Sequence, residues 1–474
     1  MLVRILLGAT FALIVWRVIG LGFRPQDDAL FHSAKAISGK SWHEILVLRD
    51  SNWVDPYPGW HAILGGVYGL SRCSVDGLVV FSIVALFLLF ALTPIALLRR
   101  PEAWALALVL MLAARPGFTT RPLLGRPYVF SMAVLLAMLL LWRRVQTEPR
   151  PLTPLIAIFV LVTAQSWIHG NWYLLALPGL ALLMARRWRA ARRIGLVTAL
   201  GVLAGACLTG HPCMFLRQTL VSRMFSLAHP QLQSMLPTEF QARYADFQSA
   251  LAVVSIVIAR RIWSRAHAEP LHRNPAFLLC CLGWVLGQRV LRFWIDWGMP
   301  AAILWTAQEL QTMLASRLPA LSWKRVPAAV GLGAVLFVTV TADTGSRWSK
   351  PWPHEPLRAD RPEHKGLLPE PGGIVYNDML QTFYMTIYGN PTGPWRYLQG
   401  SDATLMPMDD LQTLFRIRWN DGTSESYMPW VQKMRTQDRM ILLRPRDRPP
   451  NIPGLQWKYV PGDTWVGRVP AGSG

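Results

Sequence analysis

Long apolar runs, separated by short polar segments, dominate the first 342 residues of the chain. A helix that crosses a bilayer needs roughly 20 apolar residues, and fewer where neighbouring helices shield it. Runs of suitable length lie at approximately 5–23, 77–97, 103–116, 128–142, 153–167, 172–185, 194–209, 249–262, 275–290, 295–311 and 326–342. This pattern predicts a polytopic α-helical membrane protein with about eleven transmembrane helices.

The pattern changes after Ala342, where the chain becomes polar and rich in proline and turn residues. Strand-like segments follow at 373–377, 395–399, 439–443, 456–460 and 464–469, and helical patterns at 379–388 and 408–415. This mixture of strand and helix signals indicates a small α/β domain. We therefore expect a transmembrane domain over residues 1–342 and a separate C-terminal domain over residues 343–474.

The composition of the 474-residue chain supports this interpretation, because 52% of the residues are hydrophobic and only 16% are charged. Soluble domains are nearer to about a quarter charged. The net charge of +21 would suggest nucleic acid as the partner of a soluble protein. Membrane proteins, however, concentrate arginine beside their cytoplasmic helix ends, and the basic residues of this chain occupy such positions. No nucleic-acid partner is expected.

The arginine and lysine clusters fall in alternate loops between the predicted spans. These clusters are Arg99–Arg100, Arg143–Arg144, Arg186–Arg193, Arg260–Arg265 and Lys324–Arg325. Because positive residues mark the cytoplasmic side, the N-terminus is predicted to be cytoplasmic. The first external loop, residues 24–76, and the C-terminal domain are then extracytoplasmic. The first apolar run is interpreted as an uncleaved helix, since no small-x-small cleavage site follows it.

Polar residues gather near the helix ends on the predicted extracytoplasmic face. They are Asp27 with Asp28 and His32, Arg121 with Arg126, His169 with Asn171, His211, and Arg289 with Arg292 and Asp296. Unsatisfied polar groups at membrane depth are costly, so residues of this kind usually mark a functional site. Their convergence on one face predicts a single extracytoplasmic site.

Asp28 and His32 are four residues apart, which on a helix places the carboxylate and the imidazole on the same face. Such a pair could hold an acceptor hydroxyl or ligate a divalent metal ion, although one aspartate and one histidine do not complete a metal site. A carboxylate beside an acidic neighbour at the membrane boundary is harder to ionise, which suits a general base. The structural alternative is a helix start that an aspartate caps.

Arg126, Arg289 and Arg292 carry guanidinium groups, which can bind a phosphate through two parallel hydrogen bonds. The alternative is that each arginine extends its side chain to the lipid headgroups. His169 and Asn171 lie in a short break between two apolar runs. A turn explains the asparagine there, but not the histidine.

His211 precedes a proline, and we interpret it either as a ligand contact or as the cap of the preceding helix. No Walker loop, dinucleotide-binding glycine motif, zinc-type cysteine and histidine spacing or nucleophile elbow is found in a suitable context. A conventional soluble cofactor enzyme is therefore not expected. A divalent metal ion is the one cofactor that the sequence leaves open.

Several segments together match one known superfamily. They are Asp28-Ala-Leu-Phe-His32, Asp50–Trp60, Arg126-Pro-Tyr-Val-Phe-Ser131, Trp167-Ile-His-Gly-Asn-Trp172, Gly210-His-Pro, Arg289-Val-Leu-Arg-Phe293, Gly373–Asn377 and Arg439–Leu443. In this order they resemble a poorly characterised bacterial group of the GT-C glycosyltransferase superfamily, whose members use polyprenyl-phosphate-linked sugars. The order of histidine and asparagine after Trp167 departs from the commoner Asn-x-His-Gly element of that group.

The resemblance implies an inverting glycosyltransferase that moves a sugar from a polyprenyl-phosphate carrier to a glycan, lipid or protein acceptor. It places the enzyme in the bacterial cytoplasmic membrane, among membrane lipids, with its site on the extracytoplasmic face. Asp28, with Asp27 as second choice, is expected to be the base that activates the acceptor hydroxyl. The expected substrate-binding residues are Arg126, His169, Arg289, Arg292, His32, Asn171 and His211.

Two other classes of protein fit the same sequence features. A transporter or lipid flippase is the first, because intramembrane arginines also mark substrate paths. Transporters commonly consist of paired halves with broken helices, and no such internal symmetry is found in this sequence. The second is a non-catalytic scaffold of envelope assembly that would use the C-terminal domain as its binding module.

Overall fold

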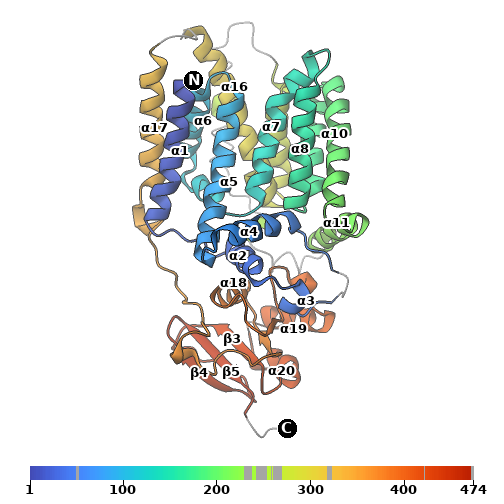
Figure 1. The fold of residues 1–474 in the computed structure, drawn as a ribbon, viewed down its shortest axis with the longest axis vertical. Coiled ribbons are helices and arrows are strands. Elements are labelled where there is room, and N and C mark those ends of the chain that lie inside the picture. Colours follow the sequence, from blue (N-terminus) through green and yellow to red (C-terminus); the bar gives the residue numbers. More distant parts are fainter. Residues whose placement is uncertain are drawn as a thin grey trace.

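The computed structural model is mostly helical, with a small sheet near its C-terminus (Figure 1). It describes residues 1–49, 53–228, 238–241, 254–257, 259, 270–317, 323–420 and 422–470. Most of the predicted span 249–262 lies outside the described residues. The long helices run side by side in one bundle, and the sheet lies beyond one end of it.

Every predicted span within the described residues coincides with a helix. The helices of the bundle are α1 (Leu2–Gly20), α5 (Val75–Leu97), α6 (Pro101–Ala114), α7 (Tyr128–Thr147), α8 (Leu152–Ile168), α9 (Ala176–Met184), α10 (Trp188–Cys207), α14 (Pro275–Gly287), α16 (Met299–Arg317) and α17 (Arg325–Thr341). Within the described residues, 4 of these helices, α1, α5, α7 and α10, are long and apolar enough to cross a membrane. The others that are apolar, such as α6 and α17, are shorter.

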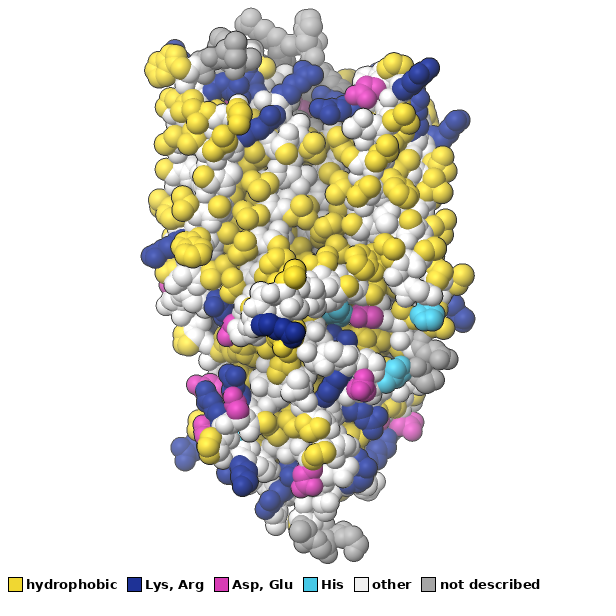
Figure 2. All heavy atoms as spheres, viewed as in Figure 1, with side chains coloured by type: hydrophobic (Ala, Val, Ile, Leu, Met, Phe, Trp, Pro, Cys, Tyr) yellow, Lys and Arg dark blue, Asp and Glu magenta, His cyan; other side chains and the backbone are white. Residues whose placement is uncertain are grey.

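Large apolar side chains cover the outside of the bundle. On α10, Leu196, Leu200 and Leu203 are all exposed, and on α1 the indole of Trp16 is 77% exposed. Figure 2 shows hydrophobic side chains spread over the bundle, with lysine and arginine at the end where the N-terminus lies and again over the part that carries the sheet. An apolar surface of this extent is unfavourable in water, so the bundle is suited to association with a membrane.

The predicted first external loop is built largely of helices. It contains α2 (Asp28–Ser38), α3 (Trp42–Ile45) and α4 (Pro58–Ser71). The Asp27 carboxylate caps α2 by accepting a hydrogen bond from the backbone N–H of Ala29 at 3.3 Å. Gly39 ends the same helix in the left-handed conformation, with φ of 63°. Since α2 packs against α4 and α5, the polar residues of α2 are held in place at one end of the bundle.

The C-terminal part contains a sheet of five strands in the order β2-β1-β3-β5-β4. Its strands are β1 (Ile374–Tyr376), β2 (Arg396–Tyr397), β3 (Arg439–Leu443), β4 (Gln456–Val460) and β5 (Thr464–Arg468), and its helices are α18 (Leu380–Gly389), α19 (Met408–Trp419) and α20 (Ser424–Lys433). The first three neighbours, β2, β1 and β3, are parallel, whereas β5 is antiparallel to β3 and β4. The predicted strands and the small α/β fold are confirmed. The sequence did not indicate α20, which contains Pro429.

The sheet and the first external segment are joined through their backbones. The N–H of Val47 donates to the carbonyl of Tyr397 at 2.9 Å, and the N–H of Arg49 donates to the carbonyl of Leu405 at 2.8 Å. Helix α18 also packs against α2. The C-terminal helices and strands are therefore held against the end of the bundle that carries Asp27 and Asp28 (Figure 1).

Candidate functional site: a buried carboxylate and guanidinium cluster

The start of α2 faces the arginine that precedes α7. Arg126 Nε lies 3.1 Å from Asp27 Oδ2 and 3.6 Å from Asp28 Oδ2, and its side chain is largely buried. On the other side, the phenol of Tyr384 from α18 donates to Asp28 Oδ1 at 2.7 Å. The predicted meeting of Asp27, Asp28 and Arg126 is thus present, and the C-terminal part supplies a hydroxyl to it.

A second group of charges lies on a π-helical turn, η5 (Trp294–Gly298), which leads into α16. Asp296, only 3% exposed, accepts two hydrogen bonds from Arg121, at 2.8 and 2.9 Å. It also accepts one from Arg292 Nε at 2.8 Å. The wider π turn places this carboxylate inside the bundle end, and π turns often occur at functional sites. All three residues are among the polar groups that the sequence places on the predicted extracytoplasmic face.

Glu239 joins the two groups of charges. Its carboxylate accepts hydrogen bonds from Arg121 and from Arg126 Nη1, the latter at 3.1 Å, and lies 3.9 Å from Arg292 Nη1. The ring of Tyr128 lies under Arg121, with 4.0 Å between the guanidinium carbon and the ring centre. Glu239 was not predicted, because it lies on the short 3-10 segment Thr238–Phe240, which has no helical or strand periodicity. We call the set Asp27, Asp28, Arg121, Arg126, Glu239, Arg292 and Asp296 the charge cluster.

Burial and pairing act in opposite directions on the acids of the charge cluster. Burial raises the pKa of Asp27, the nearby Arg126 lowers it, and the neighbouring Asp28 raises it again, which leaves it at about 6. Burial also raises the pKa of Glu239, but the guanidinium groups of Arg126 and Arg121 outweigh this effect and bring it to about 2. Asp27 is therefore the carboxylate that gains and loses a proton near neutral pH, whereas Glu239 stays ionised.

A chain of three buried or half-buried groups lies beside the charge cluster. His61 Nδ1 is 2.6 Å from Asp55 Oδ2, and His61 Nε2 is 2.9 Å from His32 Nδ1. The Asp55 carboxylate can only accept, so His61 donates to it from Nδ1. Burial lowers the pKa of His32 well below its usual value, and the nearby His61, His169 and Arg126 lower it further. His32 Nε2 has no hydrogen-bond partner among the described residues.

His169 and Asn171 belong to a neighbouring hydrogen-bond network. The amide nitrogen of Asn171 is 3.1 Å from His169 Nε2, so it donates there, and His169 Nδ1 then donates to Ser131 Oγ at 2.9 Å. Both ring nitrogens of His169 are thus engaged by protein groups. The ring of Tyr57 stacks on His169, with 5.7 Å between ring centres, and meets His32 edge-on at 4.8 Å. This network orients Tyr57 between the two histidines.

Two predicted substrate-binding residues lie apart from the contacts that build the charge cluster. His211 is exposed just before α11 (Pro212–Ala228), and its backbone N–H donates to Thr209 Oγ1 at 3.3 Å. Arg289 is exposed after the end of α14. Of the predicted cations, Arg126 and Arg292 belong to the cluster, and Arg121 joins them.

Asp28 and His32, the two residues that could ligate a metal ion, lie on one face of α2 but contact different residues. Asp28 turns to Arg126 and Tyr384, whereas His32 turns to His61. Among the described residues, no group of three or more histidine, cysteine, aspartate and glutamate side chains has an arrangement that would hold a metal ion.

Sequence comparison gives no family for this chain, since no family model matches it and no curated protein shows significant sequence similarity to it. The chemistry of the site must therefore be argued from its geometry. Asp55 and Tyr57 lie within the segment Asp50–Trp60 of the predicted first external loop, and His61 directly follows it. Nothing in their spacing indicated the hydrogen bonds that lead from Asp55 through His61 to His32. Tyr384 could not be found from sequence, because it is separated from Asp28 by 356 residues.

Proposed function

We propose that the chain is a GT-C-like membrane glycosyltransferase that moves a sugar from a polyprenyl phosphate to an acceptor hydroxyl. One observation carries this proposal: the carboxylates of Asp27 and Asp28 lie directly against the guanidinium group of Arg126, and Glu239 joins Arg126 to two further largely buried guanidinium groups, those of Arg121 and Arg292. A transferase of this kind needs a base for the incoming hydroxyl and cations for the leaving phosphate, close together. The charge cluster contains both.

The basic side chains support an extracytoplasmic position for this site. Figure 2 shows lysine and arginine at the end of the bundle opposite the sheet as well as over the C-terminal part, and such residues beside helix ends are enriched on the cytoplasmic side of membrane proteins. In this arrangement the N-terminus is cytoplasmic, about eleven helices cross the bacterial cytoplasmic membrane, and the C-terminal domain lies outside. The shorter helices, such as α6, span by tilting or by pairing with their neighbours.

In the proposed reaction, Asp27 takes the proton of the acceptor hydroxyl. The hydroxyl oxygen forms a bond to the anomeric carbon of the sugar, while the bond between that carbon and the phosphate oxygen breaks. The electron pair leaves with the polyprenyl phosphate, whose negative charge Arg121, Arg126 and Arg292 stabilise. Because the new bond forms as the old one breaks in a single displacement, the configuration of the anomeric carbon is inverted. A pKa of about 6 suits Asp27 to this role at neutral pH, and we therefore prefer it to Asp28.

Transfer in proteoliposomes tests this proposal. The purified chain is reconstituted with a labelled polyprenyl-phosphate sugar and an envelope extract as the source of acceptors, and the label in the acceptor fraction is measured. Arg126→Ala and Asp27→Asn are each expected to slow transfer about 100-fold, because they remove a cation from the leaving group and the base.

Two substitutions elsewhere on the same face serve as matched controls. Asp76→Asn changes an exposed carboxylate at the start of α5, and Arg72→Ala changes an exposed cation after α4; both should leave the rate unchanged. Full transfer by folded Arg126→Ala and Asp27→Asn proteins would contradict the proposal. Movement of the labelled lipid between leaflets without any transfer would favour a flippase instead.

A further inference from the structure

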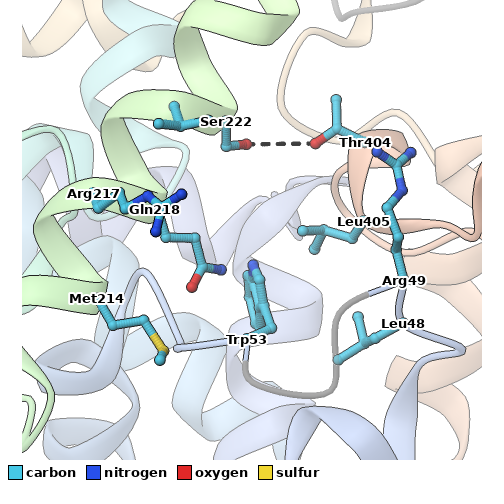
Figure 3. A pocket seen from close by; sticks show the side chains of 10 residues that line it. Leu48, Arg49, Trp53, Met214, Arg217, Gln218, Ser222, Thr404 and Leu405 are labelled. Carbon is cyan, nitrogen blue, oxygen red and sulfur yellow. Dashed lines mark hydrogen bonds between the residues drawn. The ribbon is translucent and has the colours of Figure 1, made fainter.

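A cavity of about 430 Å³ lies between the helical bundle and the C-terminal part, away from the charge cluster (Figure 3). Its walls come from α11, from the segment that follows α3, and from the loop before α19. Cavities that bind small molecules usually measure about 300–1,000 Å³ and often lie at boundaries between domains. The position and size of this cavity are therefore those of a ligand site.

Two arginines flank the cavity. Figure 3 shows Arg217 on α11 on one side and Arg49 on the other. Arg49 is fixed in place, because its Nε donates to the carbonyl of Met406 at 2.9 Å. The side chain of Arg217 makes no ion pair or hydrogen bond with any other described residue, and the described lining of the cavity contains no carboxylate. This part of the cavity is suited to an anionic group.

The floor of the cavity carries groups that suit a sugar. The indole of Trp53 stands between the two arginines in Figure 3 and offers a flat apolar face. Gln218 Oε1 accepts a hydrogen bond from the backbone N–H of Val54 at 3.0 Å, and since that N–H can only donate, the amide NH₂ of Gln218 remains available. Thr404 Oγ1 lies 3.4 Å from Ser222 Oγ and donates its own proton to Asp402, so it can accept a hydrogen bond from a ligand hydroxyl.

A narrower space continues from this cavity toward the buried networks. The two spaces share Trp53, Gln218, Ser222 and Leu405, and the narrower one ends at Tyr57 and Asn171. It also contains Asp402, whose Oδ1 already accepts hydrogen bonds from the backbone N–H and the hydroxyl of Thr404, at 3.0 and 2.7 Å. The carboxylate of Asp402 thus lines the narrower space, whereas Arg49 and Arg217 line the wider cavity. A bound molecule would place its anionic group beside the arginines and its hydroxyl groups toward the narrower space.

We propose that this cavity binds a sugar that carries a phosphate or carboxylate group. The assignment of this cavity to the acceptor depends on the transfer proposed above. The assignment to an anionic sugar depends only on the residues that line the cavity. Arg217 and Arg49 hold the anion, Trp53 stacks against the ring, and Gln218 with Thr404 contacts the hydroxyl groups.

Ligand-observed NMR on the full chain in detergent tests this proposal. The probes are glucose 6-phosphate and glucuronate, compared with glucose, with inorganic phosphate and with vesicles of anionic lipid. The two anionic sugars are expected to bind, and Arg217→Ala and Trp53→Ala should each weaken them about tenfold or more, since each loses a charged or stacking contact. Arg448→Ala, an exposed arginine of the C-terminal part, should bind like the unchanged protein.

Three results would overturn this assignment. The first is that neither anionic sugar binds. The second is that inorganic phosphate binds as tightly as the anionic sugars and that Trp53→Ala does not change its binding. The third is that only anionic lipid occupies the cavity. Binding is measured without turnover, so this test is separate from the proposed transfer. Arg126→Ala should keep anionic-sugar binding even as it loses transfer, because Arg126 does not line the cavity. If Arg126→Ala transferred normally but the sugars still bound, the enzyme proposal would fail and the cavity assignment would stand.

Discussion

At the residue scale, the carboxylate of Asp27 makes two different contacts. One carboxylate oxygen caps α2 through Ala29, and the other lies 3.1 Å from Arg126. Burial penalises the charged form of this carboxylate strongly enough that its pKa remains near 6 even beside a guanidinium group. The same carboxylate stabilises α2 as its cap and has a shifted pKa at which it can exchange a proton. Groups with shifted pKa values are common at functional sites, which favours a role of Asp27 in catalysis.

The pH dependence of transfer follows from this pKa. As pH rises through about 6, Asp27 loses its proton and becomes able to accept one, so kcat/KM should rise and then level off. Asp28→Asn removes a negative charge that raises the Asp27 pKa, so the inflection should move to lower pH. Rate profiles of the two proteins between pH 4 and pH 8 check this, with Asp76→Asn as control. An inflection that moves upward in Asp28→Asn would exclude Asp27 as the titrating base.

Glu239 occupies the place among the arginines that the account gives to a phosphate. Its carboxylate meets Arg121, Arg126 and Arg292, and a phosphate must compete with it for the same donors. Glu239→Gln keeps the shape but removes the competing charge, so geranyl phosphate should bind about tenfold more tightly. Binding is measured by titration of the purified chain, with Glu363→Gln, an exposed acid, as control. Weaker binding by Glu239→Gln would contradict this view.

At the scale of elements, close packing between α14 and the π turn η5 sets the position of Asp296. A Cβ at Gly283 would lie 2.5 Å from the Cα of Gly298 on the turn, so the two backbones touch only because both residues are glycine. Arg292 and Asp296 are carried on the chain segment that this contact holds in place.

Gly283→Ala should therefore disturb both stability and activity. The added methyl group forces α14 away from η5, and overpacking of this kind lowers the free energy of unfolding by about 1–3 kcal/mol. Transfer should fall as well, because Asp296 and its arginines shift. Chemical unfolding in detergent and the transfer rate measure these effects. The control is Gly331→Ala on α17, where a Cβ would meet nothing within 4 Å; equal behaviour of the two variants would contradict the role given to this contact.

The elements themselves could be predicted largely from the sequence. The apolar run 77–97 has the length of a membrane-spanning helix and the short apolar run 439–443 that of a buried strand, and the structure has α5 and β3 there. The contacts of the site could not be predicted in the same way. Asp28 and His32 share a face of α2 as expected, yet they face different partners, because Asp28 meets α18 and His32 meets α4. Spacing along one helix says nothing of which neighbour each residue meets.

Glu239 and Tyr384 show why the rest of the site was missed. Both reach the cluster from distant segments, one from a short 3-10 turn and one from the C-terminal part. Neither residue is distinguished by its local sequence, since Glu239 is a single acid in a short turn and Tyr384 is one of several aromatic residues on α18. Arg126 was found because a cation beside a proline at a helix entrance is unusual on the face that the sequence predicts to be extracytoplasmic.

At the scale of the whole molecule, the bundle and the C-terminal part each contribute to one end of the protein. The bundle supplies the buried charges, and the C-terminal part supplies Tyr384 to the charge cluster and Thr404 to the cavity of Figure 3. In the proposed enzyme, the lipid carrier enters from the membrane to the charge cluster, and the acceptor enters through the cavity. Both domains are then needed for one reaction.

The most direct test of this account is a structure of the full chain, determined in a lipid nanodisc with a non-reactive analogue of a polyprenyl-phosphate sugar. The account predicts that the analogue's phosphate lies within hydrogen-bonding distance of Arg121, Arg126 and Arg292, that the Glu239 carboxylate has left this position, and that the sugar faces Asp27. A phosphate bound elsewhere on the protein, with Glu239 still held by the three arginines, would contradict it.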